Sequence, residues 1–212
     1  MDDRSSVARQ VLDTARAHGA DTVFGLPGVH NLAFWDADPA PLVVRHEQAA
    51  VYAADGWARA TGRLGAAVVT TGPGAANAVA AFGEAAAARS PVLLVASEIP
   101  QALRRAGRLR GVLHESRDQA GLFAPLAKAV VTPRTPAEVA AVIGTAAVTA
   151  LAHPQGPVYV DVPAGCPSTS AGRAPGGGVP SGGATRTCSR GHRARRRGRR
   201  ARRGAGRRLG RR

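Results

Sequence analysis

The chain has 212 residues, of which 44% are hydrophobic, 20% are charged and 4% are aromatic. This composition is typical of globular domains and excludes a wholly disordered chain. No run approaches the roughly 20 apolar residues of a membrane-spanning helix, and the acidic start (Met1–Arg4) is unlike a basic secretory signal. We therefore expect a cytoplasmic protein with no membrane contact.

The net charge of +15 is concentrated near the C-terminus. Residues 186–212 contain 14 of the 29 Lys and Arg residues and no acidic residue, so the rest of the chain is close to neutral. Residues 164–212 are rich in Gly, Pro, Ser, Ala and Arg, which predicts a disordered basic tail after a folded body at 1–163. Because Cys166 and Cys188 both fall in this tail, we expect neither a disulfide nor a thiolate metal site in the body.

Within the body, short apolar runs alternate with segments whose apolar residues recur at helical spacing. The last helix is expected to open with a capping box between Thr135 and Glu138. The alternation predicts an α/β fold: a doubly wound, mostly parallel six-stranded sheet with helices on both faces. In chain order, we expect a helix capped at Ser5 or Ser6 and stopped by Gly19, strands at 22–25 and 42–45, a helix at 47–61, a strand at 66–71, a helix at 75–88, strands at 92–96 and 127–132, a helix from Thr135, and a strand at 158–162.

Open sheets of this kind bind ligands at the carboxyl ends of their strands, and three segments that follow strands are unusual. The first is residues 26–31, where Gly25 and Gly28 lie on either side of a proline and allow the backbone to pass close to another group. His30 in this segment is a candidate functional histidine. A simple turn with a solvated histidine fits the same residues.

The second segment is residues 45–48, where a strand gives way to a helix that begins at Glu47. A carboxylate in the first turn of a helix often does no more than complement the helix dipole. The alternative is a semi-buried carboxyl among the neighbouring alanines, which can hold a proton in a strong hydrogen bond to a ligand nitrogen.

The third segment is residues 70–77, which place a Gly-Pro-Gly turn after a strand and Asn77 near the start of the next helix. The glycines remove side chains where a flat ligand could lie. The spacing fits neither a dinucleotide-binding glycine motif nor a P-loop, because position 77 is Asn and no Gly-Lys-Ser/Thr follows.

Four segments, taken in order, resemble the N-terminal pyrimidine-binding domain of thiamine-diphosphate enzymes, namely GLPGVHN, RHEQAAVYAADGWARATG, VVTTGPGAANAV and SPVLLVAS. This family includes acetolactate synthase, benzoylformate decarboxylase and related 2-oxoacid decarboxylases. Residues 111–115, 118–119 and Lys128 fit the same family, as does the closing GPVYVDVP. The resemblance covers roughly residues 5–163, the whole predicted body.

The resemblance implies a role for each of these segments. In the family, the Glu of the RHE motif hydrogen-bonds N1′ of the aminopyrimidine ring of the cofactor and so activates it, which makes Glu47 the expected catalytic residue. The residues expected to face a 2-oxoacid substrate are Val29, His30, Asn31, His114 and Gln119. Those expected to bind thiamine diphosphate are Pro27, Gly28, Glu47, Thr71, Gly72, Pro73, Gly74 and Asn77.

In this family, a separate C-terminal domain holds the diphosphate and Mg²⁺ through a Gly-Asp-Gly motif, which does not occur in these 212 residues. We therefore expect this chain to bind only the pyrimidine half of the cofactor, to supply no metal ligand and to be inactive when isolated. A middle domain, which binds FAD in some relatives, is also missing, so the sequence leaves FAD undecided. The resemblance further implies a homodimer or tetramer formed through this domain, or pairing with a diphosphate-binding domain.

The basic tail allows three interpretations. It could be an arm that holds nucleic acid or another polyanion by charge, a plain disordered extension, or the product of an out-of-frame translation. The change in composition coincides with the place where the family begins its next domain, and a shifted frame of GC-rich DNA yields Arg, Gly, Ala, Pro and Ser, which favours the last interpretation. The alternative to an enzyme domain is a non-catalytic protein whose Arg-rich tail binds nucleic acid.

Overall fold

The structure, a computed structural model, describes residues 3–100, 103 and 108–163. The chain divides into two units, Met1–Ser170 and Ala171–Arg212, and every described residue lies in the first. The predictions for the basic tail and for both cysteines therefore lie outside the described residues. Among the described residues, no helix combines the length and the apolar character that crossing a membrane requires.

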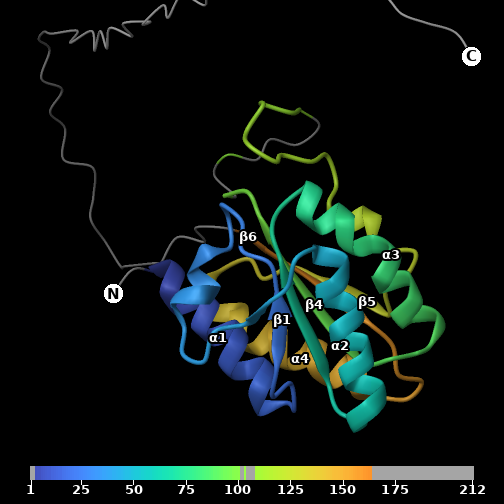
Figure 1. Cartoon of the computed structure of the whole chain (residues 1–212). Coiled ribbons are helices and arrows are strands. Elements are labelled where there is room, and N and C mark those ends of the chain that lie inside the picture. The colour runs from blue at the N-terminus through green and yellow to red at the C-terminus, as the bar shows by residue number, and fades with distance from the viewer. Residues whose placement is uncertain (1–2, 101–102, 104–107, 164–212) are drawn as a thin grey trace, which may run out of the picture. The chain divides into compact units, whose positions relative to one another are not determined.

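A parallel sheet of six strands forms the centre of the fold (Figure 1). Its strands are β1 Val23–Gly25, β2 Leu42–Val43, β3 Gly65–Val69, β4 Val92–Glu98, β5 Ala129–Val131 and β6 Val158–Pro163. They lie side by side in the order β2-β1-β3-β4-β6-β5, and every neighbouring pair is parallel. The central strands β3, β4 and β6 are buried at every residue, as expected for a parallel sheet covered on both faces.

Helices cover both faces of the sheet (Figure 1). They are α1 Asp3–Ala17, α2 Glu47–Thr61, α3 Pro73–Ala87 and α4 Val139–Leu151. Helices α1 and α4 pack over one apolar core and α2 and α3 over a second. Along β4, Leu93 belongs to the first core and Leu94 to the second, and successive strand residues point to opposite faces. The predicted doubly wound α/β fold is therefore confirmed.

The strand order places a switch point between β1 and β3. The chain passes from β1 to β2 on one side of the sheet, and from β3 through α3 to β4 on the other. In open sheets of this kind, ligands bind in the crevice where neighbouring connections diverge, at the carboxyl ends of the strands. Two of the three segments for which the sequence predicts a site, residues 26–31 and 70–77, follow β1 and β3.

Two predicted helix starts differ from the structure. Helix α1 begins at Asp3, before Ser5 and Ser6, the residues expected to cap it. Helix α3 begins at Pro73 and has Gly72 as its N-cap, so most of the expected Gly-Pro-Gly turn belongs to the helix. Proline suits the first helical position because its missing N–H would have no partner inside the helix.

The expected capping box before α4 is wrong. Thr135 makes no side-chain capping bond, and Glu138 Oε2 accepts the backbone N–H of Arg134 at 2.9 Å. The chain forms a 3₁₀ turn at Pro136–Glu138 before α4 starts. In this tighter turn, the Glu138 carboxylate accepts the N–H of Arg134. A capping box would instead use the N–H of Thr135, the next residue.

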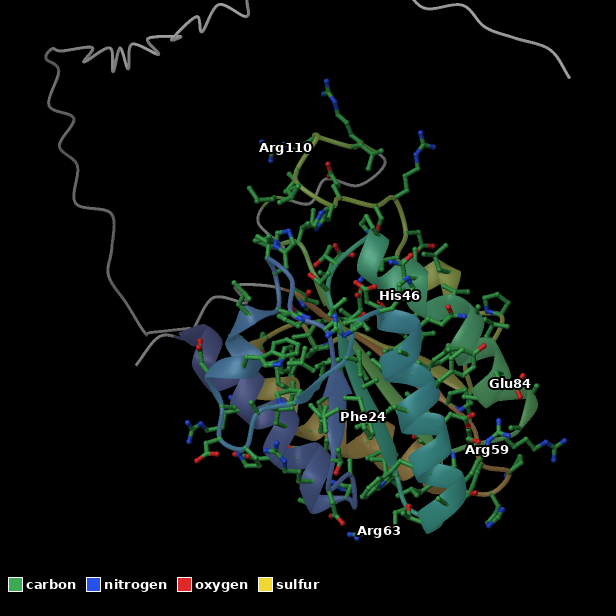
Figure 2. All side chains as sticks on the ribbon, viewed as in Figure 1. Phe24, His46, Arg59, Arg63, Glu84 and Arg110 are labelled. Carbon is green, nitrogen blue, oxygen red and sulfur yellow. The ribbon has the colours of Figure 1, made fainter. Side chains whose placement is uncertain are left out.

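Helix α2 lies very close to β3 because small residues meet at their contact. A Cβ at Gly65 would lie 2.0 Å from the Ala54 carbonyl oxygen, a distance that no side chain allows. The helix begins where His46 Nδ1 accepts the backbone N–H of Gln48, and it ends at Gly62, whose φ of +70° is left-handed. Because α2 follows the parallel strand β2, its N-terminus lies at the carboxyl edge of the sheet, where Figure 2 labels His46.

An ion pair joins α2 to α3 at the ends of these helices that lie away from His46 (Figure 2). Arg59 Nε donates to Asp55 Oδ1 at 2.9 Å, and Arg59 Nη2 lies 3.4 Å from Glu84 Oε1 on α3. The hydrogen bond to Asp55, which is largely buried, raises the pKa of the Arg59 guanidinium. This contact is a surface ion pair between two helices that pack side by side, and it lies far from the N-termini of both helices.

Candidate functional site

Glu47 is a buried carboxylate at the first position of α2, only 8% exposed. Its Oε2 accepts a hydrogen bond from Asn77 Nδ2, on α3, at 3.1 Å. Its Oε1 accepts no hydrogen bond from the described residues and lies beside Gly74, where a Cβ would be 3.1 Å away. One oxygen therefore orients the carboxyl, and the other is available to a ligand.

Thr70 fills the space between the two glycine-containing segments. A Cβ at Gly28 would lie 2.6 Å from Thr70 Cβ, and a Cβ at Gly74 would lie 2.5 Å from Thr70 Cγ2. Both glycines are therefore required by the close approach of this threonine. The register explains the contact, because Gly25 at the end of β1 is paired with Val68 in β3, so the two segments leave the sheet side by side. The buried Thr70 hydroxyl has no hydrogen-bond partner among the described residues.

Gly72, the N-cap of α3, has a φ of +64° and a ψ of −109°, which side chains disfavour. Its N–H donates to Gln119 Oε1 at 2.5 Å. A Cβ at Gly72 would lie 2.3 Å from the carbonyl oxygen of His114. The neighbouring Thr71 is fully buried, and its hydroxyl exchanges a hydrogen bond of 3.0 Å with that of Ser97.

The segment after β1 is shaped by a buried asparagine. Asn31 is 1% exposed, its Oδ1 accepts the N–H of Gly28 at 2.6 Å, and its Nδ2 donates to the Leu26 carbonyl at 3.1 Å. Pro27 and Val29 are exposed, with 62% of Val29 open to solvent. Asn31 therefore holds the turn, while Val29 and His30 are presented at its surface.

The structure brings the side chains of His30 and His114 together. Their rings meet edge to face with centroids 5.8 Å apart, and His30 Nε2 lies 3.1 Å from the Leu113 carbonyl oxygen. His114 has a φ of +63°, a left-handed conformation that is uncommon outside glycine. Two predicted substrate-facing residues, far apart in sequence, thus lie next to each other, beside the turn at Gly72.

Glu115 shapes the backbone that carries His114. Its Oε2 accepts the backbone N–H groups of Arg110 and Val112, at 2.7 and 3.2 Å. The hydrogen bond from the Arg110 N–H is the main reason why the pKa of the Glu115 carboxyl is lowered. Glu115 thus stabilises the loop, a role that the family motif at residues 111–115 had not indicated.

Comparison with known families gives one match over most of the folded body. Residues 5–122 match the family described as "Thiamine pyrophosphate enzyme, N-terminal TPP binding domain". The chain belongs to this thiamine pyrophosphate enzyme family. The resemblance drawn from the glycine and RHE motifs is therefore confirmed.

Curated proteins of this family include relatives with different chemistry. The chain is 36% identical over 160 residues to a probable acetolactate synthase large subunit of Methanocaldococcus jannaschii, and the match covers 74% of this chain and 26% of that protein. It is 35% identical over 175 residues to a probable 2-ketoarginine decarboxylase of Pseudomonas aeruginosa, with coverages of 77% and 31%. The chain thus spans between about a quarter and a third of the length of these relatives.

A solved structure supports the same assignment. The thiamine diphosphate-dependent 4-hydroxybenzoylformate decarboxylase of Rhodococcus jostii superposes with a TM-score of 0.66 at 31% identity. The superposition covers 74% of this chain and 30% of the decarboxylase. This agreement extends the family assignment from sequence motifs to the fold.

Sequence reasoning missed a buried polar network around Gln119. Tyr159 OH donates to Asp161 Oδ1 at 2.9 Å, and both side chains contact the amide of Gln119. Burial raises the pKa of the Tyr159 hydroxyl well above its usual range, so the hydroxyl remains a donor. An acid within the apolar strand VYVDVP was the available signal, because a buried carboxylate needs partners.

The adjacent threonines Thr70 and Thr71 should respond in opposite directions to the same substitution. Thr70→Val removes a buried hydroxyl that lacks a partner, so the free energy of unfolding should rise by about 1 kcal/mol. Thr71→Val breaks the hydrogen bond to Ser97, so the same quantity should fall by about 1 kcal/mol. Urea denaturation measures both, and an equal loss in the two variants would show that the Thr70 hydroxyl is hydrogen-bonded.

Proposed function

We propose that this chain forms the pyrimidine-binding half of an active site that acts on a 2-oxoacid, with Glu47 as its catalytic residue. The observation that best supports this is the geometry of Glu47, whose Oε2 is held by Asn77 while Oε1 accepts no hydrogen bond from the described residues. The two relatives named as decarboxylases act, by their names, on 2-ketoarginine and 4-hydroxybenzoylformate. Both are 2-oxoacids.

The residues around Glu47 fit an aminopyrimidine ring. Glycine at position 74 keeps side-chain atoms away from Oε1, since a Cβ there would lie 3.1 Å from it. A flat heterocycle needs such a surface together with one hydrogen-bonding group in its plane. The predicted cofactor-binding residues Pro27, Gly28, Thr71, Gly72 and Pro73 belong to the two segments that meet at Thr70.

The residues of this chain would have separate roles around the pyrimidine ring. Thiamine diphosphate, when bound, supplies the carbon nucleophile and the electron sink for breaking the bond beside a 2-oxo group. Glu47 would share a proton between Oε1 and the pyrimidine N1′, while Asn77 keeps the carboxyl in one orientation. His30 and His114, whose rings are in contact, would face the substrate.

The other half of the site would come from a second domain. We propose that a diphosphate-binding domain, in another subunit or a separate polypeptide, provides the Mg²⁺ ligands, and that a homodimer or tetramer forms through this domain. The 212-residue polypeptide alone should then give no turnover. Decarboxylation of a 2-oxoacid by the purified chain, above a blank without thiamine diphosphate, would contradict this part of the proposal.

The role of Glu47 is tested by the exchange of the cofactor's C2 proton. The chain is combined with a diphosphate-binding domain of the family, and the exchange of this proton into deuterated water is followed by NMR. Glu47→Gln should slow the exchange by about 100-fold or more, the range typical of a proton-transferring group. The control is Glu84→Gln, which removes an exposed carboxylate at the distant end of α3 and should leave the rate unchanged. Undiminished exchange in Glu47→Gln would refute the proposal.

A further inference from the structure

Residues 114–119 hold Gly72 from two sides. On one side, the carbonyl oxygen of His114 occupies the place that a side chain at position 72 would need, 2.3 Å from an ideal Cβ. On the other side, Gln119 Oε1 accepts the Gly72 N–H at 2.5 Å. The peptide at which β3 gives way to α3 is therefore fixed by a segment more than 40 residues further along the chain.

Gln119 uses its whole amide within the protein. Its Nε2 lies 2.7 Å from Asp161 Oδ1 and 3.0 Å from both the Ser97 carbonyl oxygen and the Tyr159 hydroxyl. An amide nitrogen has two hydrogens, so three acceptors at these distances exceed its capacity. The residue is also 1% exposed. These contacts leave no donor for a substrate, the role that the sequence predicted for Gln119.

The hydrogen bond to Gly72 replaces a helix cap that α3 lacks. Its N-cap is a glycine, which has no side chain to cap the helix, and Pro73 brings no N–H. In a capping box, a Glu or Gln three residues into the helix accepts the N–H of the N-cap residue, but that position of α3 is Ala75. Gln119 supplies this acceptor from another part of the chain.

The position of the first turn of α3 determines where Asn77 lies, one turn further along. Asn77 in turn donates to Oε2 of Glu47. Hydrogen bonds therefore join Asp161 to Gln119, Gln119 to Gly72, and Asn77 to Glu47, and the first turn of α3 connects Gly72 to Asn77.

We propose that Gln119 is a positioning residue, which fixes the Gly72 peptide and the first turn of α3 and thereby sets the Asn77–Glu47 contact. The structural part of this proposal is independent of any cofactor. Its consequence for catalysis rests on the proposed function of Glu47. His114 would owe its place beside Gly72 to the same anchor, because it lies five residues before Gln119.

The first experiment compares two variants by ¹⁵N NMR of the 212-residue chain. Gln119→Met removes the acceptor for the Gly72 N–H, so amide exchange at Gly72 should accelerate about tenfold or more and the Asn77 side-chain signals should shift. The matched control is Tyr159→Phe, which deletes a different contact of the same Gln119 amide and keeps its bond to Gly72. This control should leave the Gly72 exchange and the Asn77 signals as in the wild type.

A measurement on the wild type keeps the test decisive if Gln119→Met does not fold. A scalar coupling across the hydrogen bond should join the Gly72 ¹⁵N to the side-chain amide ¹³C of Gln119. Absence of this coupling, or unchanged Gly72 and Asn77 signals in a folded Gln119→Met, would overturn the proposal.

Adding thiamine diphosphate to the wild-type chain, combined with a diphosphate-binding domain of the family, separates the two proposals. If the cofactor leaves the Asn77 signals unmoved while Gln119→Met shifts them, the function proposed for Glu47 fails and the positioning role of Gln119 stands. If the cofactor moves the Asn77 signals and Gln119→Met does not, the positioning role fails and the function of Glu47 stands.

Discussion

Replacing Phe123 by alanine should lower the free energy of unfolding by about 3–5 kcal/mol, the loss typical of a buried phenylalanine. Phe123 is fully buried and directly follows the 3₁₀ turn Ala120–Leu122. Its ring stacks on that of Tyr159 in β6, with centroids 4.1 Å apart, and meets that of Phe82 in α3 edge to face at 5.2 Å. Three separate elements are joined by these rings. Because domains are stable by only about 5–15 kcal/mol, the loss is a large share of the total.

Urea denaturation measures this loss, with Leu122→Ala as the matched control. Leu122 is the preceding residue but is 43% exposed, so its truncation should cost less than about 1 kcal/mol. Phe123→Ala should also loosen the anchor of Gln119 and accelerate amide exchange at Gly72. Equal losses in the two variants would show that the three rings do not hold this segment to the sheet.

The sequence predicts the framework because local patterns determine it. The uniformly apolar run at 92–96 indicates a central parallel strand, and β4 is buried at every residue. Helix α2 has the predicted bounds, since Glu47 begins its amphipathic pattern and Gly62 ends it. Strand β2 is only two residues long, because both of its residues are exposed at the edge of the sheet and bury little.

The sequence does not show which polar residues near the site face a ligand. Asn31 and Gln119 are polar residues in loops near strand ends, and a ligand contact was predicted for both. In the structure, Asn31 satisfies the backbone of its own turn and Gln119 that of Gly72. Buried backbone groups at strand ends need hydrogen-bond partners, and so do the polar atoms of a bound ligand. The residue type alone therefore does not show whether a polar side chain serves the backbone or a ligand. The register of β4 and β6 places Ser97 near Asp161, and the loop that ends in the 3₁₀ turn at Ala120–Leu122 brings Gln119 to both.

Gly72→Ala adds a single methyl group, and it should lower the stability of the protein more than any other such addition in the site. The new Cβ would lie 2.3 Å from the His114 carbonyl oxygen, and a backbone atom cannot move aside as a flexible side chain can. The φ of +64° adds backbone strain of about 1–3 kcal/mol, and overpacking adds about 1–3 kcal/mol more. We therefore expect the free energy of unfolding to fall by about 3 kcal/mol or more in urea denaturation.

Gly62→Ala separates the two contributions. Gly62 has a φ of +70°, but a Cβ there would meet nothing within 4 Å, so its replacement carries backbone strain alone, about 1–2 kcal/mol. The loss of stability in Gly72→Ala beyond that in Gly62→Ala therefore measures how tightly residues 114–119 pack against the start of α3. If the two variants lose equal stability, the His114 carbonyl does not occupy this place, and the contact that brings His114 to the Glu47 side of the sheet is absent. A large excess, together with shifted Asn77 signals, would mean that the conformation of one glycine sets the geometry of the carboxylate.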